Sequence, residues 1–383
     1  MSDPIKKGIR ADGSTYYWFR VSGGFDATGK RLQVYRSGAL RRDVLAEYGK
    51  VLHELAEKRF VAKDGITVNQ YLDKWESAHC RGLEEGSRAQ VRHALQYVRD
   101  RLGTKKMQDL DRWDIERLVD WMATRGRKRG GKPGTPLGPR TISLMLLHFS
   151  AACEDAVDEK LMGTNPCRKV KRPAQVKPAH DLWSDEETAR FAAAAAEDRL
   201  NPVIELQCLG LRPEEVCGLH WRRDVKLAKR LLQIQGARTI VDGKVIEKGP
   251  KTAAGGRDLP LDEALAASLA AFRELQAFER RAAGDGYAPG DYVLCDELGQ
   301  PYDPARLRRV WYRLMRQAGV RKIKPYTASR HAAGTYLSHA GVSPDIIAAW
   351  LGHTDASFTM KTYVHTRPED LATARDILAR RGA

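Results

Sequence analysis

The chain has 383 residues, of which 42% are hydrophobic and 30% are charged. This composition is ordinary for a globular protein, so wholesale disorder and collagen-like repeats are excluded, and the length suits two or three domains. The apolar runs fall well short of the roughly 20 residues that span a bilayer. The N-terminal residues are charged and lack the apolar core of a signal peptide. We therefore expect a soluble, cytoplasmic protein with no membrane partner.

The charge balance points to a polyanionic partner. Sixty-five Lys and Arg residues against 49 Asp and Glu residues give a net charge of +16. A field of this size attracts nucleic acid and releases its counterions on binding. An anionic membrane is the alternative, but no amphipathic terminal helix or lipidation motif supports it. Nucleic acid is the partner that the sequence favours.

No motif for a metal ion or a nucleotide cofactor is present. The six cysteines are scattered without a C-x-x-C pair, which is typical of small core residues in a reducing compartment. The sequence also lacks a P-loop and an H-E-x-x-H motif. We expect no metal and no cofactor.

Residues 1–65 predict a small basic module. Aromatic and β-branched residues favour strands over Thr15–Val21 and Arg31–Arg36, with a third over Lys6–Arg10. From Ala39 to Phe60 the apolar residues recur at helical spacing. A small sheet with Lys and Arg on its exposed face suits a DNA major groove. The alternative is that these charges only keep a small domain in solution.

Residues 66–172 predict an all-helical domain, and the basic, proline-bounded residues 173–180 predict a linker. A glycine-rich basic loop, Arg125–Pro133, either contacts phosphates or is only solvated. Ser184 and Glu187 form a capping box, which predicts a helix start and a domain boundary near residue 180. Residues 181–383 alternate between helical segments and short strands. The predicted fold class is multidomain α+β, with a three-stranded N-terminal sheet plus helix, a helical middle domain and a mainly helical C-terminal domain with a small antiparallel sheet.

The C-terminal domain contains five short motifs in a fixed order. They are Leu209-Gly210-Leu211-Arg212-Pro213-Glu214-Glu215, Lys251-Thr252, Arg330-His331, Leu351-Gly352-His353, and Tyr363, ten residues after His353. In residue type and order they resemble the motifs of the tyrosine recombinase (phage integrase) family. The resemblance extends to nearly the whole chain and implies an arm-binding-domain-containing integrase. Residues 1–65 are similar to an arm-site DNA-binding domain, 66–172 to a core-binding domain, and 181–383 to a catalytic domain.

The resemblance implies a site-specific DNA recombinase that integrates or excises a mobile element without a cofactor. Its implied catalytic residues are Tyr363, which forms a 3′-phosphotyrosine; Arg212 and Arg330, which hold the phosphate oxygens; Lys251, which protonates the leaving 5′-oxygen; and His353, which hydrogen-bonds the phosphate. Glu215 is implied to orient Arg212.

One residue departs from the family pattern. The family places histidine three residues before the second arginine, and here that position is Thr327. Threonine donates a hydrogen bond but is no base near neutral pH. The general base is therefore open, and the nearby candidates are Tyr326, His331 and His353.

Two alternative functions share the same motifs. One is a type IB topoisomerase-like enzyme, and the other is a catalytically weakened DNA-binding regulator on the same fold. The arm-like N-terminal module favours the recombinase over the topoisomerase, and the intact Tyr363 favours an enzyme over the regulator. The expected partners are double-stranded DNA at core and arm sites, three further copies of the chain in a homotetramer on DNA, a host DNA-bending protein and a directionality factor. The expected location is the bacterial cytoplasm, at the nucleoid.

Overall fold

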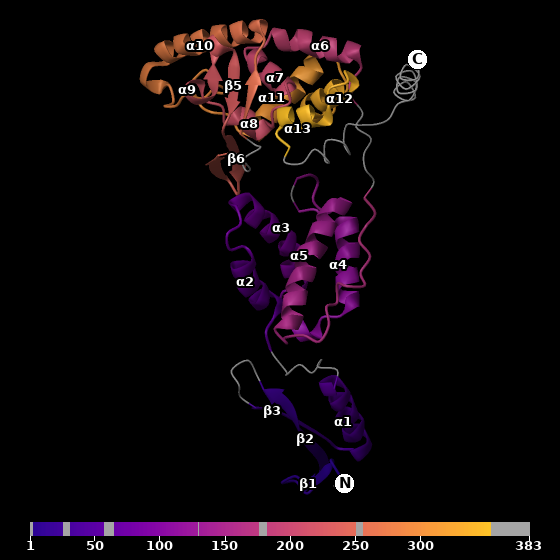
Figure 1. Ribbon diagram of the computed structural model, residues 1–383. Coiled ribbons are helices and arrows are strands. Elements are labelled where there is room, and N and C mark those ends of the chain that lie inside the picture. The colour runs from indigo at the N-terminus through magenta and orange to yellow at the C-terminus, as the bar shows by residue number, and fades with distance from the viewer. Residues whose placement is uncertain are drawn as a thin grey trace, which may run out of the picture. The chain divides into compact units, whose positions relative to one another are not determined.

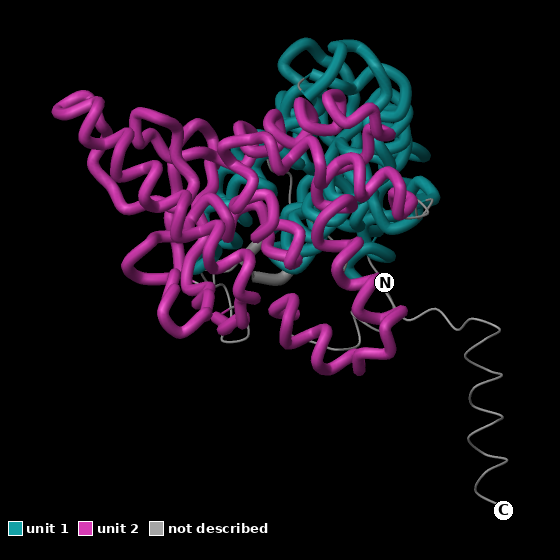
Figure 2. Tube along the Cα trace, turned by 90° about the horizontal axis from the view of Figure 1, so that it is seen from above, with its two compact units in different colours: residues 1–177 teal, residues 178–383 magenta. Residues whose placement is uncertain are grey.

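The computed structural model describes residues 3–25, 31–56, 65–128, 130–175, 182–249 and 256–353 (Figure 1). The chain forms two compact units, residues 1–177 and 178–383 (Figure 2). Two predicted catalytic residues, Lys251 and Tyr363, lie outside the described residues. Within those residues, no helix is long and apolar enough to cross a membrane.

The N-terminal module has the predicted sheet and helix. Strands β1 (Lys6–Ile9), β2 (Thr15–Phe25) and β3 (Arg31–Gly38) form an antiparallel sheet in that order, and helix α1 (Arg41–Ala56) packs against it. The buried core consists of Ile5, Phe19, Val34, Val44 and Val51. Because side chains alternate along a strand, the residues between these core positions face away from the helix. That open face carries Lys6, Tyr16, Trp18, Arg20 and Tyr35.

The second part of unit 1 is all-helical, as predicted. Helices α2 (Val68–His79), α3 (Glu85–Leu102), α4 (Arg112–Arg125) and α5 (Pro139–Asp158) bury one apolar face each in a common core. Helix α2 begins at a capping box of Thr67 and Gln70, and α4 begins at one of Asp111 and Asp114. Each box satisfies two backbone N–H groups that the first helical turn leaves without partners.

The basic loop after α4 contains internal hydrogen bonds from Arg127. The Arg127 guanidinium donates from Nε to Thr135 Oγ1 (3.0 Å) and from Nη2 to the Pro136 carbonyl (2.9 Å). The Arg127 backbone also pairs with Thr135 and Gly134. This arginine therefore ties the two sides of the loop together, and phosphate contact by the loop stays a prediction.

Unit 2 is mainly helical with a small antiparallel sheet, as predicted. Its sheet has the order β4 (Val225–Lys226), β5 (Leu231–Ile234), β8 (Arg257–Pro260), and β6 (Ala237–Val241) and β7 (Lys244–Lys248) form a separate hairpin. The helices outside the site are α6 (Asp185–Ala196), α7 (Asn201–Cys208), α9 (Trp221–Asp224), α10 (Glu263–Ala283), α11 (Pro304–Gln317) and α12 (Ala332–His339). The predicted capping box is confirmed, since Ser184 Oγ accepts the Glu187 N–H and the Glu187 carboxylate accepts the Ser184 N–H.

Two tryptophans next to the predicted motifs pack in this unit. Trp221 is buried and donates from Nε1 to Gln276 Oε1 at 2.7 Å. Trp350 packs against the same core and donates from Nε1 to the Leu209 carbonyl at 2.7 Å. Both side chains therefore serve the packing of this unit.

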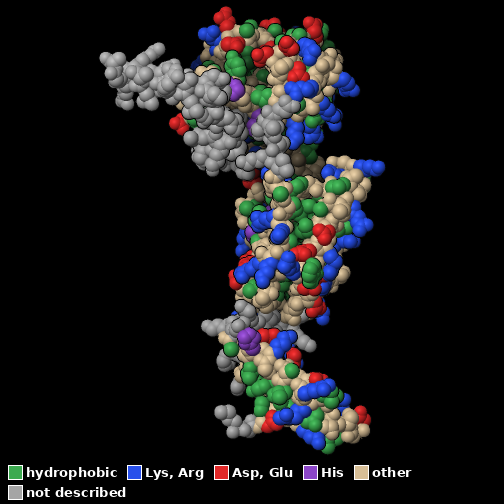
Figure 3. All heavy atoms as spheres, turned by 90° about the vertical axis from the view of Figure 1, so that its right-hand side faces the viewer, with side chains coloured by type: hydrophobic (Ala, Val, Ile, Leu, Met, Phe, Trp, Pro, Cys, Tyr) green, Lys and Arg blue, Asp and Glu red, His purple; other side chains and the backbone are tan. Residues whose placement is uncertain are grey.

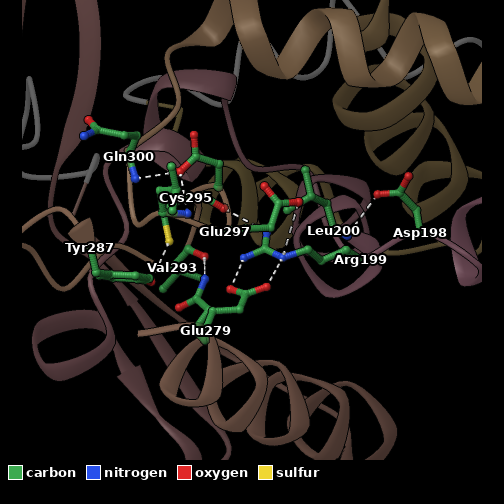
Figure 4. Close-up of polar contacts among 12 residues, drawn as sticks. Asp198, Arg199, Leu200, Glu279, Tyr287, Val293, Cys295, Glu297 and Gln300 are labelled. Atoms are coloured by element: carbon green, nitrogen blue, oxygen red, sulfur yellow. Dashed lines mark hydrogen bonds and ion pairs between the residues drawn. The ribbon is translucent and has the colours of Figure 1, made fainter. Parts of the chain in front are cut away.

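A bidentate ion pair joins the turn before α7 to helix α10 (Figure 4). Arg199 donates from Nε and Nη2 to the two carboxylate oxygens of Glu279, each at 2.6 Å, and from Nη1 to the Cys295 carbonyl at 2.9 Å. Only 18% of the Arg199 side chain and 12% of the Glu279 side chain is exposed. A buried charge that loses its partner keeps its desolvation penalty.

We expect Arg199→Met to lower the free energy of unfolding by about 3 kcal/mol, because Glu279 would be left buried without a cation. Urea unfolding checks this value. The double variant Arg199→Met/Glu279→Leu should recover part of the loss. Arg230→Met is the control: its ion pair with Glu263 is exposed, so the expected change is below about 1 kcal/mol. An equal loss in both single variants would contradict the prediction.

Candidate active site

The first site element is the turn that presents Arg212. Gly210 has φ +101°, a backbone conformation that side chains disfavour, and helix α8 (Pro213–Cys217) follows with proline at its first position. Glu215, one turn into α8, accepts the Arg212 backbone N–H at 2.8 Å and its Nη1 at 2.7 Å. The carboxylate thus fixes both the backbone and the side chain of Arg212, as predicted for Glu215.

The second element is a π-helical turn, Thr327–His331, that buries Arg330 completely. Its Nη1 donates to the Gly210 carbonyl at 2.7 Å, and its Nη2 donates to the Leu351 carbonyl at 2.5 Å. Burial, with the Arg212 cation nearby, lowers the pKa of the Arg330 guanidinium from its usual value. Two carbonyl dipoles stabilise this buried cation.

The third element is the C-terminal end of helix α13 (Pro344–Leu351). Gly352 follows in the left-handed conformation, φ 66° and ψ 50°, and ends the helix. The last carbonyls of a helix have no partner within it and carry its partial negative charge. Here three consecutive carbonyls accept from three arginines: Trp350 from Arg257 Nε (2.7 Å), Leu351 from Arg330 Nη2 (2.5 Å) and Gly352 from Arg212 Nη2 (2.9 Å).

Arg257 is a site residue that the sequence did not reveal. It is the first residue of β8, and its Nη1 and Nη2 donate to the two carboxylate oxygens of Glu215 at 3.1 and 3.0 Å. In sequence it stands only at the start of a predicted strand, 42 residues after Glu215. No spacing rule connects the two, because their contact depends on the tertiary fold.

The cluster is cationic. Burial raises the pKa of the Glu215 carboxyl, but hydrogen bonds and charge from Arg257 and Arg212 outweigh burial, and the net pKa is lowered. Glu215 is therefore a carboxylate near neutral pH. Three guanidinium groups and one carboxylate leave a net charge of +2, which suits an anion such as a phosphodiester.

His353 is neutral in this surrounding. Burial, followed by the cations Arg330, Arg212 and Arg257 and by His331, lowers the pKa of its imidazole to about 4. Its backbone N–H donates to the Ala348 carbonyl at 2.9 Å, directly after α13. A neutral imidazole has one donor nitrogen and one acceptor nitrogen, so His353 can hydrogen-bond a phosphate or accept a proton.

Thr327 begins the π-helical turn, and its backbone N–H donates to the Lys324 carbonyl at 2.8 Å. Two of the candidate bases form a pair, since the Tyr326 ring contacts the His331 ring edge-on with centroids 4.9 Å apart. His331 also acts on the pKa of His353. His331 and His353 are thus both close to the arginine cluster.

A cleft of about 720 Å³ adjoins this cluster. Arg212 lines it together with Arg308, Lys324 and Tyr326. In the part of the chain that the structure describes, no three His, Cys, Asp or Glu side chains are grouped closely enough to hold a metal ion.

Of the five predicted catalytic residues, the structure brings together Arg212, Arg330 and His353, with Glu215 beside them. Lys251 and Tyr363 lie outside the described residues.

Gly210→Ala tests how tightly the turn packs on α13. A Cβ atom at Gly210 would lie 2.6 Å from Leu351 Cδ2, and the backbone would also be strained. We expect a loss of about 1–3 kcal/mol of stability and slower DNA cleavage. Gly243→Ala in the β6–β7 turn is the control, because its φ is also positive but no atom lies within 4 Å of the new Cβ. Slower cleavage in the control as well would rule out the Leu351 contact as the cause.

Known proteins are similar to this chain in sequence. Residues 186–370 match the sequence profile of the phage integrase family. The chain is 25% identical over 390 residues to a XerC-like tyrosine recombinase of Caldanaerobacter subterraneus subsp. tengcongensis, covering 96% of both chains. It is 23% identical over 357 residues to the ICEBs1 integrase of Bacillus subtilis (strain 168), covering 92% of this chain and 94% of that one.

Residues 186–370 form the phage integrase domain of a tyrosine recombinase.

Solved structures share the fold. The Tn1549 transposon integrase in complex with transposon right-end DNA superposes with a TM-score of 0.65 at 19% identity, covering 82% of this chain and 100% of that chain. A lambda integrase tetramer bound to a Holliday junction gives 0.53 at 17% identity, covering 95% of this chain and 97% of that chain. This recombinase is accordingly an enzyme that cleaves and rejoins DNA at specific sites, a function that mobile elements use.

Proposed function

We propose that the cluster around the end of α13 binds the scissile phosphate of a core site. Arg212 and Arg330 contact the non-bridging oxygens, and neutral His353 adds a hydrogen bond. The observation that carries this proposal is the convergence of these three side chains from separate segments into a site of net positive charge. Arg330 Nε is also buried with no acceptor among the described residues, so one donor of this guanidinium is still unpaired.

The proposed reaction needs no external energy source. The Tyr363 hydroxyl oxygen forms a bond to phosphorus while the bond to the 5′-oxygen breaks, which leaves a 3′-phosphotyrosine and a 5′-hydroxyl. Lys251 supplies the proton to the leaving oxygen, and His331 or His353 accepts the proton of the tyrosine. The cations stabilise the charge of the five-coordinate transition state. The phosphotyrosine conserves the bond energy, so religation is the same reaction reversed.

Substrate binding is proposed to involve both units. The open face of the N-terminal sheet combines cations with aromatic rings: Lys6 Nζ lies 5.3 Å from the Trp18 ring, which contacts Tyr35. Such a face suits an arm site in a DNA groove. Figure 3 shows one side of the molecule, on which Lys and Arg side chains occur over both units. Residues 66–172 would bind the core site next to the catalytic domain.

The assembly is proposed to be a homotetramer on DNA in the bacterial cytoplasm, at the nucleoid, assisted by a DNA-bending protein and a directionality factor. The lambda integrase tetramer on a Holliday junction supports the first part of this proposal. The N-terminal module supports the second part, because a chain with two DNA-binding parts can hold an arm site and a core site at once, and bending the DNA between the sites brings them together.

A nicked suicide substrate tests the proposed function. The wild-type protein should become covalently attached to the 3′ side of the break, and peptide mapping of the adduct should identify Tyr363. Tyr363→Phe removes only the nucleophilic oxygen, so it should bind the same DNA and form no adduct. Attachment through another residue would overturn the assignment. Relaxation of supercoiled DNA without any exchange between two sites would favour the topoisomerase-like alternative, and no adduct at all would favour the regulator.

A further inference from the structure

The end of α13 is held by three arginines, and Arg257 is the one that the sequence did not predict. Arg212 has 32% of its side chain exposed and lines the cleft, and Arg330 is a predicted phosphate ligand. Arg257 has 6% of its side chain exposed and both of its terminal nitrogens engaged by Glu215. Its hydrogen bonds to Glu215 and to the Trp350 carbonyl connect it to Arg212 and to the helix end that carries His353.

We propose that Arg257 is a positioning residue for the DNA cleavage described above. It fixes the orientation of the Arg212 side chain and the surroundings of His353. This inference rests on the proposed function and adds to it a residue outside the predicted catalytic set.

The first connection runs through Glu215. One carboxylate oxygen accepts from both Arg212 Nη1 (2.7 Å) and Arg257 Nη1 (3.1 Å), and the other accepts from the Arg212 backbone and Arg257 Nη2. Glu215 therefore cannot rotate without breaking a bond to one of the two arginines. Arg257 fixes the carboxylate, and the carboxylate fixes Arg212.

The second connection runs through α13. Arg257 Nε donates to the Trp350 carbonyl at 2.7 Å, three residues before His353. The same helix end receives Arg330 and Arg212 at the next two carbonyls. Arg257 thereby joins the strand that follows the Lys251 segment to the helix end that carries His353. It is also one of the cations that lower the pKa of His353.

Arg257→Met tests this role, because it keeps most of the side-chain volume and removes the charge and all donors. We expect it to bind core DNA within a few-fold of wild type and to form the covalent adduct about 100-fold more slowly, since misplaced catalytic groups cost rates of that order. Arg257→Lys keeps the charge but offers no planar pair of donors, so it should recover only part of the rate. Arg230→Met, an exposed arginine lost from the same unit, should leave the rate unchanged.

A second readout is independent of cleavage. The pKa of His353 is followed by NMR titration of its imidazole, assigned with His353→Gln, in the DNA-free protein. The groups that face it are Arg330, Arg212, Arg257 and His331. Loss of one cation should raise the His353 pKa in Arg257→Met and leave it unchanged in Arg230→Met. If Arg257→Met does not fold, Arg257→Lys serves for the cleavage measurement, and its expected result is slower cleavage with no change in DNA affinity.

A double-variant cycle with Glu215→Gln tests whether Arg257 acts on cleavage through Glu215. If Arg257 acts through Glu215, the rate losses of the two variants should be far from additive. The proposal would be overturned if the rate losses of the two variants were additive. It would also be overturned if Arg257→Met cleaved at the wild-type rate, or if its slower cleavage were explained by weaker DNA binding. An absence of adduct in the wild-type protein would instead count against the proposed function, while the His353 titration would still report on Arg257.

Discussion

Replacing Arg330 with methionine is expected to slow DNA cleavage by about a thousandfold, at the upper end of the loss seen when one donor to a transition-state oxygen is removed. Arg330 is fully buried and held by the Gly210 and Leu351 carbonyls, so its guanidinium is fixed in one position. The measurement is single-turnover adduct formation on a suicide substrate, with DNA affinity determined separately.

The stability of the Arg330→Met variant should change far less than its activity. Two carbonyls lose their donors, which costs about 1–3 kcal/mol each, but removal of a desolvated cation offsets part of that cost. Urea unfolding should therefore show a modest loss. Arg330→Lys is the companion variant, with a single point charge instead of a fork, and it should remain well below wild-type activity. Cleavage near the wild-type rate in either variant would remove Arg330 from the catalytic set.

Glu215→Gln is expected to have the second largest effect, because it acts on both stability and cleavage. The substitution keeps the shape of the side chain but leaves Arg212 and Arg257 close together without a counter-charge. Breaking a buried ion pair in this way costs about 3–5 kcal/mol. We also expect the cleavage rate to fall by about 100-fold, because the Arg212 side chain loses its fixed orientation. Urea unfolding and adduct formation measure the two effects, and a loss of stability with unchanged cleavage would contradict the positioning role.

Glu215 should also make the stability of the protein depend on pH. The pKa of Glu215 is lower in the folded chain than its ordinary value, so the unfolded chain binds more protons and stability rises with pH. This stabilisation is complete above the unfolded pKa of about 4.3 and is lost as the pH falls through the folded pKa. In Glu215→Gln the contribution should be missing. Unfolding curves between neutral pH and pH 3 should therefore converge for the two proteins at the acid end, and parallel curves would contradict the assignment.

Local sequence signals predicted the elements of this fold well. The capping box at Ser184 and Glu187, the turn at Gly210 and the strand that begins at Arg257 follow from residue type and short spacing alone. The motifs also identified Arg212, Arg330 and His353, three predicted catalytic residues that the fold brings together. Each of these features depends on chemistry within a few residues of chain.

The missing features depend on contacts that no local pattern encodes. Arg257 reaches Glu215 and Trp350 across 42 and 93 residues of sequence. In sequence, Arg127 likewise does not differ from the other basic residues of its loop. Its bond to the Pro136 carbonyl is known only from the fold. An arginine looks the same in sequence whether it binds DNA, ties a loop or holds a carboxylate, and only the fold separates the three.

The N-terminal module is small enough for its ligand to matter to its folding. Its core has five buried apolar side chains beneath three strands and one helix. A domain of this size is marginally stable on its own, and DNA that binds only the folded form adds its binding free energy to folding. An arm site would then act on the module as a folding template as well as an anchor.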